Sequence, residues 1–249
     1  MRMKISNLKV ERIVWVLLIV SLVLYGIDYL IFGRGGEIGF GFLGNLAFLP
    51  FYVLFVTLVV ERVLKSREQA AIKQKLNMVI GAFFSEVGNR LLRDFFGFIR
   101  NAQELACHLR FTTQWAAADF TKAADSLQVK EIQADSRLGD LAALKCFLME
   151  KRGFMLGLLE NPNLLEHDEF TDLLWAVFHL IEELEARRSL DRLPGSDMNH
   201  LSVDIKRAYS HLIREWIMYM RHLQQDYPYL YSLAARTNPM NPDARVEVV

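Results

Sequence analysis

The sequence predicts an all-α membrane protein, in which a two-helix transmembrane hairpin is followed by a cytoplasmic helical bundle. Two apolar runs, at about 13–32 and 40–60, each have the roughly 20 residues that a helix needs to cross a bilayer. Only a short glycine-rich segment separates the runs, so we expect an antiparallel hairpin. Beyond residue 65, apolar residues recur at spacings of three and four, which indicates helices rather than strands.

Basic residues flank the hairpin on one side. Lys and Arg concentrate before the first run and after the second, whereas the connecting loop contains only Arg34. Because Lys and Arg gather on the side that is not translocated, we expect an integral protein of the plasma (inner) membrane with both termini in the cytoplasm. The expected divisions are an N-terminal segment 1–12, a hairpin 13–62, a cytoplasmic helical domain 63–236 and a flexible tail 237–249.

Three residues within the apolar runs suggest a functional role. Asp28 lies near the outer end of the first run between Tyr25 and Tyr29, which favours an interfacial carboxylate over a functional one. Asn45 and Pro50 could mark a kinked helix that lines a pore, although helix packing explains such residues more often. Two spans cannot enclose a pathway alone, so a channel would require oligomerisation.

A long helix is expected to continue from the second run through the charged segment 61–75. Its buried face runs from Leu76 to Phe98, with apolar residues every three or four positions. The polar stretch 127–137 is expected to be an exposed loop. Further helices are expected at 113–127, 138–159 and 167–189, with a last long helix that starts at Ser196 or Asp197 and a short one at Pro228.

The last long helix contains three 11-residue units, each beginning with His-Leu and carrying a carboxylate four residues after the histidine. Eleven residues make almost three helical turns, so the histidines form one column and the leucines a neighbouring column, which we expect to be core. A similar pair, His179 and Glu183, lies on the preceding helix. The units are His200 with Asp204, His211 with Glu215, and His222 with Asp226.

A histidine and a carboxylate four residues apart share a helix face and can bind one metal ion if another helix adds ligands. The pair at His179 could meet the unit that begins at His211 or the one that begins at His200, and we expect the former. Ion pairs at the edge of the core, or a pH-sensing role, would use the same residue types. The candidate metal ligands are His179, Glu183, His211 and Glu215.

Several function classes lack support in the sequence. No nucleotide-binding loop or catalytic constellation is recognisable, and Cys107 and Cys146 are isolated, so we expect neither an enzyme nor a cofactor. The chain has 29 basic and 29 acidic residues, and past residue 65 there are 22 basic and 25 acidic ones, which argues against nucleic-acid binding. No string of residues matches a motif of a characterised family.

The function that these features favour is a membrane-anchored helical scaffold that oligomerises or docks a partner at the cytoplasmic membrane face. The expected partners are the lipid bilayer and either another copy of the chain or a membrane protein. Two alternatives remain open. One is an oligomeric ion-conducting or gating protein lined by the second run, and the other is a metal-binding helical bundle that uses the His–carboxylate pairs.

Overall fold

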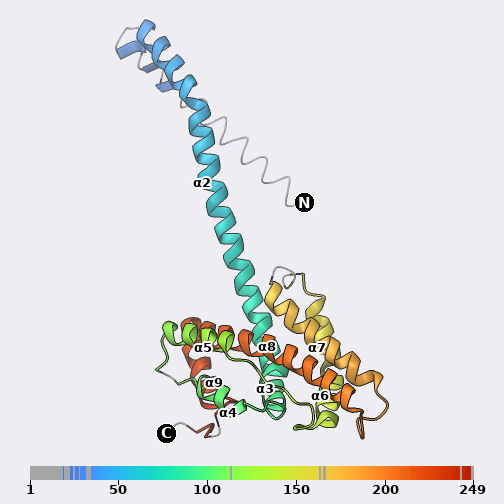
Figure 1. Cartoon of the computed structure of the whole chain (residues 1–249). Coiled ribbons are helices and arrows are strands. Elements are labelled where there is room, and N and C mark those ends of the chain that lie inside the picture. Colours follow the sequence, from blue (N-terminus) through green and yellow to red (C-terminus); the bar gives the residue numbers. More distant parts are fainter. Residues whose placement is uncertain are drawn as a thin grey trace. The chain divides into compact units, whose positions relative to one another are not determined.

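The computed structural model describes residues 19, 23–24, 26–27, 29–31, 35–112, 114–162, 164, 167–241 and 243–247. Helices dominate these residues, and the one β-bridge among them joins Ile99 to Ala134. The chain divides into two compact units, Met1–Gln69 and Ala70–Val249 (Figure 1).

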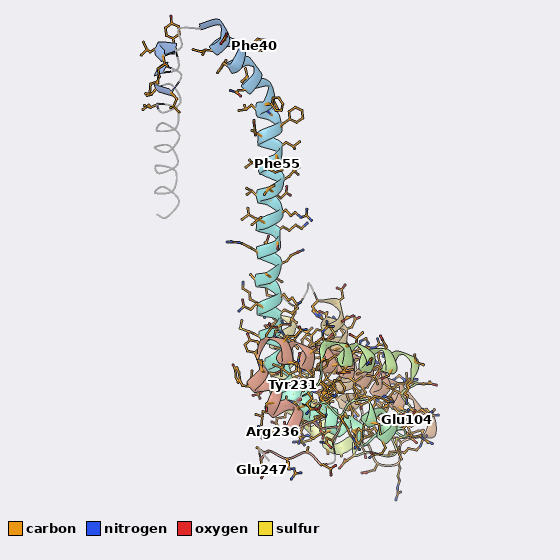
Figure 2. The ribbon with its side chains drawn as sticks, turned by 90° about the vertical axis from the view of Figure 1, so that its left-hand side faces the viewer. Phe40, Phe55, Glu104, Tyr231, Arg236 and Glu247 are labelled. Atoms are coloured by element: carbon orange, nitrogen blue, oxygen red, sulfur yellow. The ribbon has the colours of Figure 1, made fainter. Side chains whose placement is uncertain are left out.

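Helix α2 spans Gly35–Phe83 and is 49 residues long. It confirms that the second apolar run and the charged segment after it form one continuous helix, with Pro50 inside it. In the first unit its side chains project outward, as Phe40 and Phe55 illustrate (Figure 2), with 83% and 67% of their surface exposed.

The predicted transmembrane hairpin is wrong. A membrane span requires about 20 consecutive apolar residues in one helix, and among the described residues no helix is long and apolar enough to cross a membrane. The second run, 40–60, is instead one part of a helix that continues into the charged residues from Glu61 onward. The all-α membrane fold, the membrane-anchored scaffold, the inner-membrane location and the cytoplasmic orientation are corrected accordingly. The ion-conducting alternative is also wrong, because it requires the second run to span the membrane.

Some expectations concern residues outside the described ones. These include the N-terminal segment 1–12, most of the first apolar run and its acidic residue, Asp28. Asn45 is described, and it lies exposed on α2.

In the second unit, the expected long helix is interrupted by a π-helical turn, η1, directly after α2. A π-turn shifts the register of the helix by a fraction of a turn, and here it places Phe84 and Val87 in the core. The elements that follow α2 are η1 (Phe84–Gly88), α3 (Asn89–Phe96), α4 (Ala102–Cys107), α5 (Ala117–Val129), α6 (Leu141–Leu159), α7 (Asp168–Ala186), α8 (Gly195–Asp226) and α9 (Pro228–Arg236).

Helices α7 and α8 form the centre of this unit and pack against each other (Figure 1). Helices α3, α5 and α9 contact α8, while α6 contacts α7. The predicted leucine column of α8 is confirmed as core, because Leu201, Leu212 and Leu223 are all buried. α8 begins after Pro194, slightly earlier than the expected N-caps, and α9 starts with Pro228 at its first turn as predicted.

The polar stretch after α5 is not the exposed loop that its composition predicts. Asp135 and Ser136 are buried, because the loop folds over the core and its polar groups find partners there. Asp135 accepts a hydrogen bond from the Arg100 side chain at 2.5 Å and one from the backbone N–H of Arg137 at 3.1 Å. The backbone N–H of Ser136 donates to Ser202 Oγ on α8.

The C-terminal residues also contact the second unit. The Tyr231 hydroxyl of α9 (Figure 2) donates to the Thr112 carbonyl at 2.8 Å. After α9, the Asn238 side chain donates to the Leu109 carbonyl at 2.7 Å, and Met240 is buried beside Tyr209. The segment expected as a tail therefore begins with residues that are part of the core.

Candidate metal centre

The register of α7 against α8 is set by the turn between them. Residues 187–194 connect the helices, and Arg192 in this turn has a positive φ of 60°. In an antiparallel pair, residues equally far from the turn centre face each other. With the centre at Asp191–Arg192, His179 faces Asp204 and Glu183 faces His200.

Four side chains meet at this level of the helix pair and form a closed ring of alternating histidines and carboxylates. His179 Nε2 lies 3.5 Å from Asp204 Oδ1 and 3.9 Å from Glu183 Oε1. His200 Nε2 lies 3.3 Å from Asp204 Oδ2 and 3.4 Å from Glu183 Oε2. One ligand atom from each residue lies within 4.8 Å of all the others.

The spacing of these side chains is compatible with a four-coordinate metal ion. Zinc binds histidine nitrogen and carboxylate oxygen at about 2.0–2.2 Å in tetrahedral sites, so neighbouring ligand atoms are roughly 3.3–3.5 Å apart. Here one ligand atom from each residue lies within 4.8 Å of the others. The side chains would therefore have to move closer together to bind one ion.

Asp204 is the buried member of the group. Only 2% of its side chain is exposed, compared with 43% for His179 and 49% for His200. Asp204 Oδ2 has no hydrogen-bond partner among the described residues. A buried carboxylate oxygen without a partner is costly, at about 1–3 kcal/mol or more, and a cation between the four side chains would remove that cost.

Two arginines each donate a hydrogen bond to one oxygen of the two carboxylates. Arg187 donates to Glu183 Oε2 at 2.8 Å, and Arg207 donates to Asp204 Oδ1 at 3.1 Å. The hydrogen bond from Arg187 is the main reason that the pKa of Glu183 is lowered, so Glu183 stays ionised, which is the form that binds metal. Glu183 Oε1 and Asp204 Oδ2 stay directed at the histidines, and such outer partners fix the orientation of metal ligands.

Arg187 is itself held in place by a second acid. Its Nε and Nη2 atoms donate to the two oxygens of Asp197 at 2.9 and 2.5 Å. It also donates to the backbone carbonyl of Glu183. The fork of Arg187 thus ties the end of α7 to the first turn of α8 next to the four side chains.

The other two predicted ligands lie elsewhere on α8. His211 and Glu215 are eleven residues beyond His200 and Asp204, or roughly 16 Å along the helix axis. At that distance from the turn they face the start of α7. His211 interacts with Asp172, which opposes the burial that lowers the pKa of His211. Burial, followed by the charge of Glu169, raises the pKa of Glu215 to about 7.

The structure thus brings His179 and Glu183 together with His200 and Asp204, and not with His211 and Glu215. Sequence reasoning recognised both units as possible partners, because all three units of α8 share one helix face. The signal that separates them is the turn at 187–194, whose position in the sequence sets the register. Counting outward from that turn selects the unit that begins at His200.

Comparisons with known proteins identify the family. The model of the C-terminal helical domain of uncharacterized protein MJ1433 matches residues 72–236, and that of its N-terminal helical domain matches residues 4–64. Uncharacterized protein MJ1433 of Methanocaldococcus jannaschii is 42% identical over 226 residues, which cover 90% of this chain and 90% of that protein. No solved structure matches the chain. The chain therefore belongs to the MJ1433 family of two-domain helical proteins.

Proposed function

We propose that this chain is a metal-binding helical protein, in which one divalent ion links α7 to α8 through His179, Glu183, His200 and Asp204. The observation that carries the proposal is the meeting of four ligand side chains, with one ligand atom from each within 4.8 Å of the others. One of the four is the buried Asp204, whose Oδ2 lacks a hydrogen-bond partner among the described residues. A set of two imidazoles and two carboxylates suits zinc.

The proposed ion has a structural or sensory role rather than a catalytic one. Catalytic zinc sites keep a coordination position open for water, whereas structural sites fill all four with protein ligands. Here the chain supplies four ligands, two from each helix. Each pair is separated by one helical turn, so the ion would cross-link the helices at the centre of the second unit.

Ion pairing alone offers a competing explanation of the cluster. With both histidines protonated, the group would be a network of charge pairs between α7 and α8, and exposed networks of this kind contribute little. In that network protonated His200, whose Nε2 lies 3.3 Å from Asp204 Oδ2, would pair with this oxygen. The two explanations differ in that the network alone predicts no selective affinity for transition metals.

Calorimetric titration of zinc into chelator-treated protein distinguishes the two explanations. We expect the unaltered chain to bind about one ion, and His200→Ala to bind it at least about tenfold more weakly because one of four ligands is lost. His211→Ala is the matched control: it removes a histidine from the same helix face but outside the group, and it should bind zinc like the unaltered chain. Failure of the unaltered protein to bind zinc, or equal affinity of the His200 and His211 variants, would overturn the proposal.

A further inference from the structure

A second polar site lies in a cavity of about 420 Å³ in the second unit, between the end of α2 and the C-terminal half of α8. This volume falls in the range of small-molecule sites, which is roughly 300–1,000 Å³. The cavity uses none of the four candidate metal ligands. The α2 residues that line it belong to Ala70–Val249.

One buried group at this cavity points to a ligand. Glu215 lines the cavity and is 2% exposed, yet its Oε1 atom has no hydrogen-bond partner in the described part of the chain. Burial favours the neutral, protonated form of this acid, because an unpaired buried carboxylate is strongly unfavourable. A neutral carboxyl carries one O–H donor.

Cations line the same cavity. Lys73 of α2 and Arg221 of α8 both contribute to its wall, and neither makes an ion pair or side-chain hydrogen bond with the residues that the structure describes. The acid Asp226 is already engaged, since its Oδ2 lies 2.7 Å from His222 Nδ1. The cavity therefore combines two unpaired positive charges with a hydrogen-bond donor, which favours an anion.

Apolar side chains form one part of the wall, with Leu76 and Ile80 on α2 and Met218 on α8. Polar side chains line the remainder: Asn77, His167, His222 and Gln225. Tyr219 also lines the cavity and is fixed by stacking on Phe84 of η1, with ring centroids 4.8 Å apart. Such a wall fits a molecule with an apolar body. An inorganic oxyanion would leave it in contact with water.

We propose that this cavity binds a small organic acid, whose anionic group contacts Arg221 and Lys73 and accepts a hydrogen bond from Glu215, while its apolar body packs against Leu76, Ile80 and Met218. Arginine suits this role because its planar fork binds a carboxylate with two parallel hydrogen bonds. The proposal is independent of the metal centre, and it is tested on chelator-treated protein.

The test measures binding of hexanoate to the full chain at pH 6 by ligand-observed NMR and calorimetry. Inorganic phosphate serves as an oxyanion without an apolar body, and 1-hexanol as the same body without charge. We expect saturable binding of hexanoate, with phosphate and hexanol at least about tenfold weaker. Equal binding of phosphate and hexanoate would overturn the role assigned to the apolar wall, and no saturable binding of hexanoate would overturn the proposal.

Two arginine variants test whether Arg221 contacts the bound hexanoate. Arg221→Gln should weaken hexanoate binding at least about tenfold, whereas Arg214→Gln, which changes an exposed arginine of the same helix outside the cavity, should leave it unchanged. Equal affinities of these two variants would contradict the assignment of Arg221. Thermal unfolding of each variant verifies that it is folded.

Glu215→Gln tests whether the protonated carboxyl of Glu215 donates a hydrogen bond to the ligand. The carboxamide keeps an N–H donor at all pH values, so its binding should change less between pH 6 and pH 8 than that of the unaltered chain. Burial raises the pKa of Glu215 to about 7. The charged or titratable groups around it are Lys73 on α2, His167 and Glu169 at the start of α7, and His211, Tyr219, Arg221, His222 and Asp226 on α8. The two proteins differ only at position 215, so the difference between the two pH profiles reports on Glu215. Identical profiles would contradict its role as donor.

Discussion

Glu215 is a buried acid whose protonation state should be visible in the stability of the protein. Its pKa in the folded chain, raised by burial to about 7, lies above the ordinary value, so the folded state binds the proton more tightly than the unfolded state between about pH 4.5 and 7. The stability that depends on this proton is complete below that window and is lost as the pH rises through it. The loss amounts to at most about 3.5 kcal/mol, at roughly 1.4 kcal/mol per pH unit.

Replacing this acid tests the sign of the effect. Glu215→Gln should flatten the fall in unfolding free energy between pH 5 and 7.5, because the carboxamide does not titrate. Urea unfolding at a series of pH values measures it. A slope equal to that of the unaltered chain would show that Glu215 is not the titrating group.

The pKa of Asp135 is shifted in the opposite direction to that of Glu215, so its contribution to stability depends on pH in the opposite sense. Hydrogen bonds from the Arg137 backbone and the Arg100 side chain lower its pKa, so its contribution to stability is present above its ordinary pKa and is lost as the pH falls. Asp135→Asn should cost about 1.5–3 kcal/mol at pH 7, since the hydrogen bonds involve charged groups. Asp125→Asn on the exposed face of α5 is the control and should change unfolding by less than about 0.5 kcal/mol. Similar losses in both variants in urea unfolding would contradict this account.

At the scale of the elements, the π-turn η1 depends on close packing at Gly88. A Cβ atom at this position would lie 2.4 Å from the ring of Phe84, the ring that stacks on Tyr219. Gly88→Ala should therefore destabilise the chain by about 1–3 kcal/mol, because the ring must leave its packed position. Thermal unfolding provides the measurement.

Gly153 of α6 is the matched control. A Cβ there would meet nothing within 4 Å, so Gly153→Ala should stabilise the chain by about 0.5–1 kcal/mol through higher helix propensity. If both substitutions changed the melting temperature in the same direction, the close approach of Phe84 to Gly88 would not explain the effect of Gly88→Ala.

Helical periodicity predicted most of the described elements, because burial of one face leaves a direct trace in the spacing of apolar residues. It could not predict η1, since a π-turn depends on packing around Phe84 and Gly88 rather than on composition. The loop at Asp135 was misjudged for a similar reason: its polar side chains are buried because they find partners on distant elements. Apolar length alone predicted a transmembrane hairpin, and the described helices do not support it.

The residues of the candidate metal centre were predictable in type but not in register. The spacing of His179 and Glu183, and of the three units on α8, indicated shared helix faces from the sequence alone. Which unit faces α7 depends on where the chain turns, and a shift of eleven residues changes the partners without changing the pattern. The turn at 187–194 resolves this in favour of His200 and Asp204.

For the whole molecule, a bound ion should appear as added stability, because the ion joins two helices of the core. Zinc at 100 times its dissociation constant should stabilise the folded chain by about 2.7 kcal/mol, which corresponds to roughly 5–10 °C for a protein of this size. Glu183→Gln should reduce the shift, and His211→Ala should preserve it. A shift of equal size in the Glu183 and His211 variants, in thermal unfolding with and without zinc, would indicate binding elsewhere.

Elemental analysis of the chain purified without chelator shows whether the four side chains hold a metal ion. We expect about one equivalent of zinc or another transition metal in the unaltered chain and in His211→Ala, with a large loss in His200→Ala. Less than about a tenth of an equivalent in the unaltered protein, or equal metal content in the His200 variant, would contradict it.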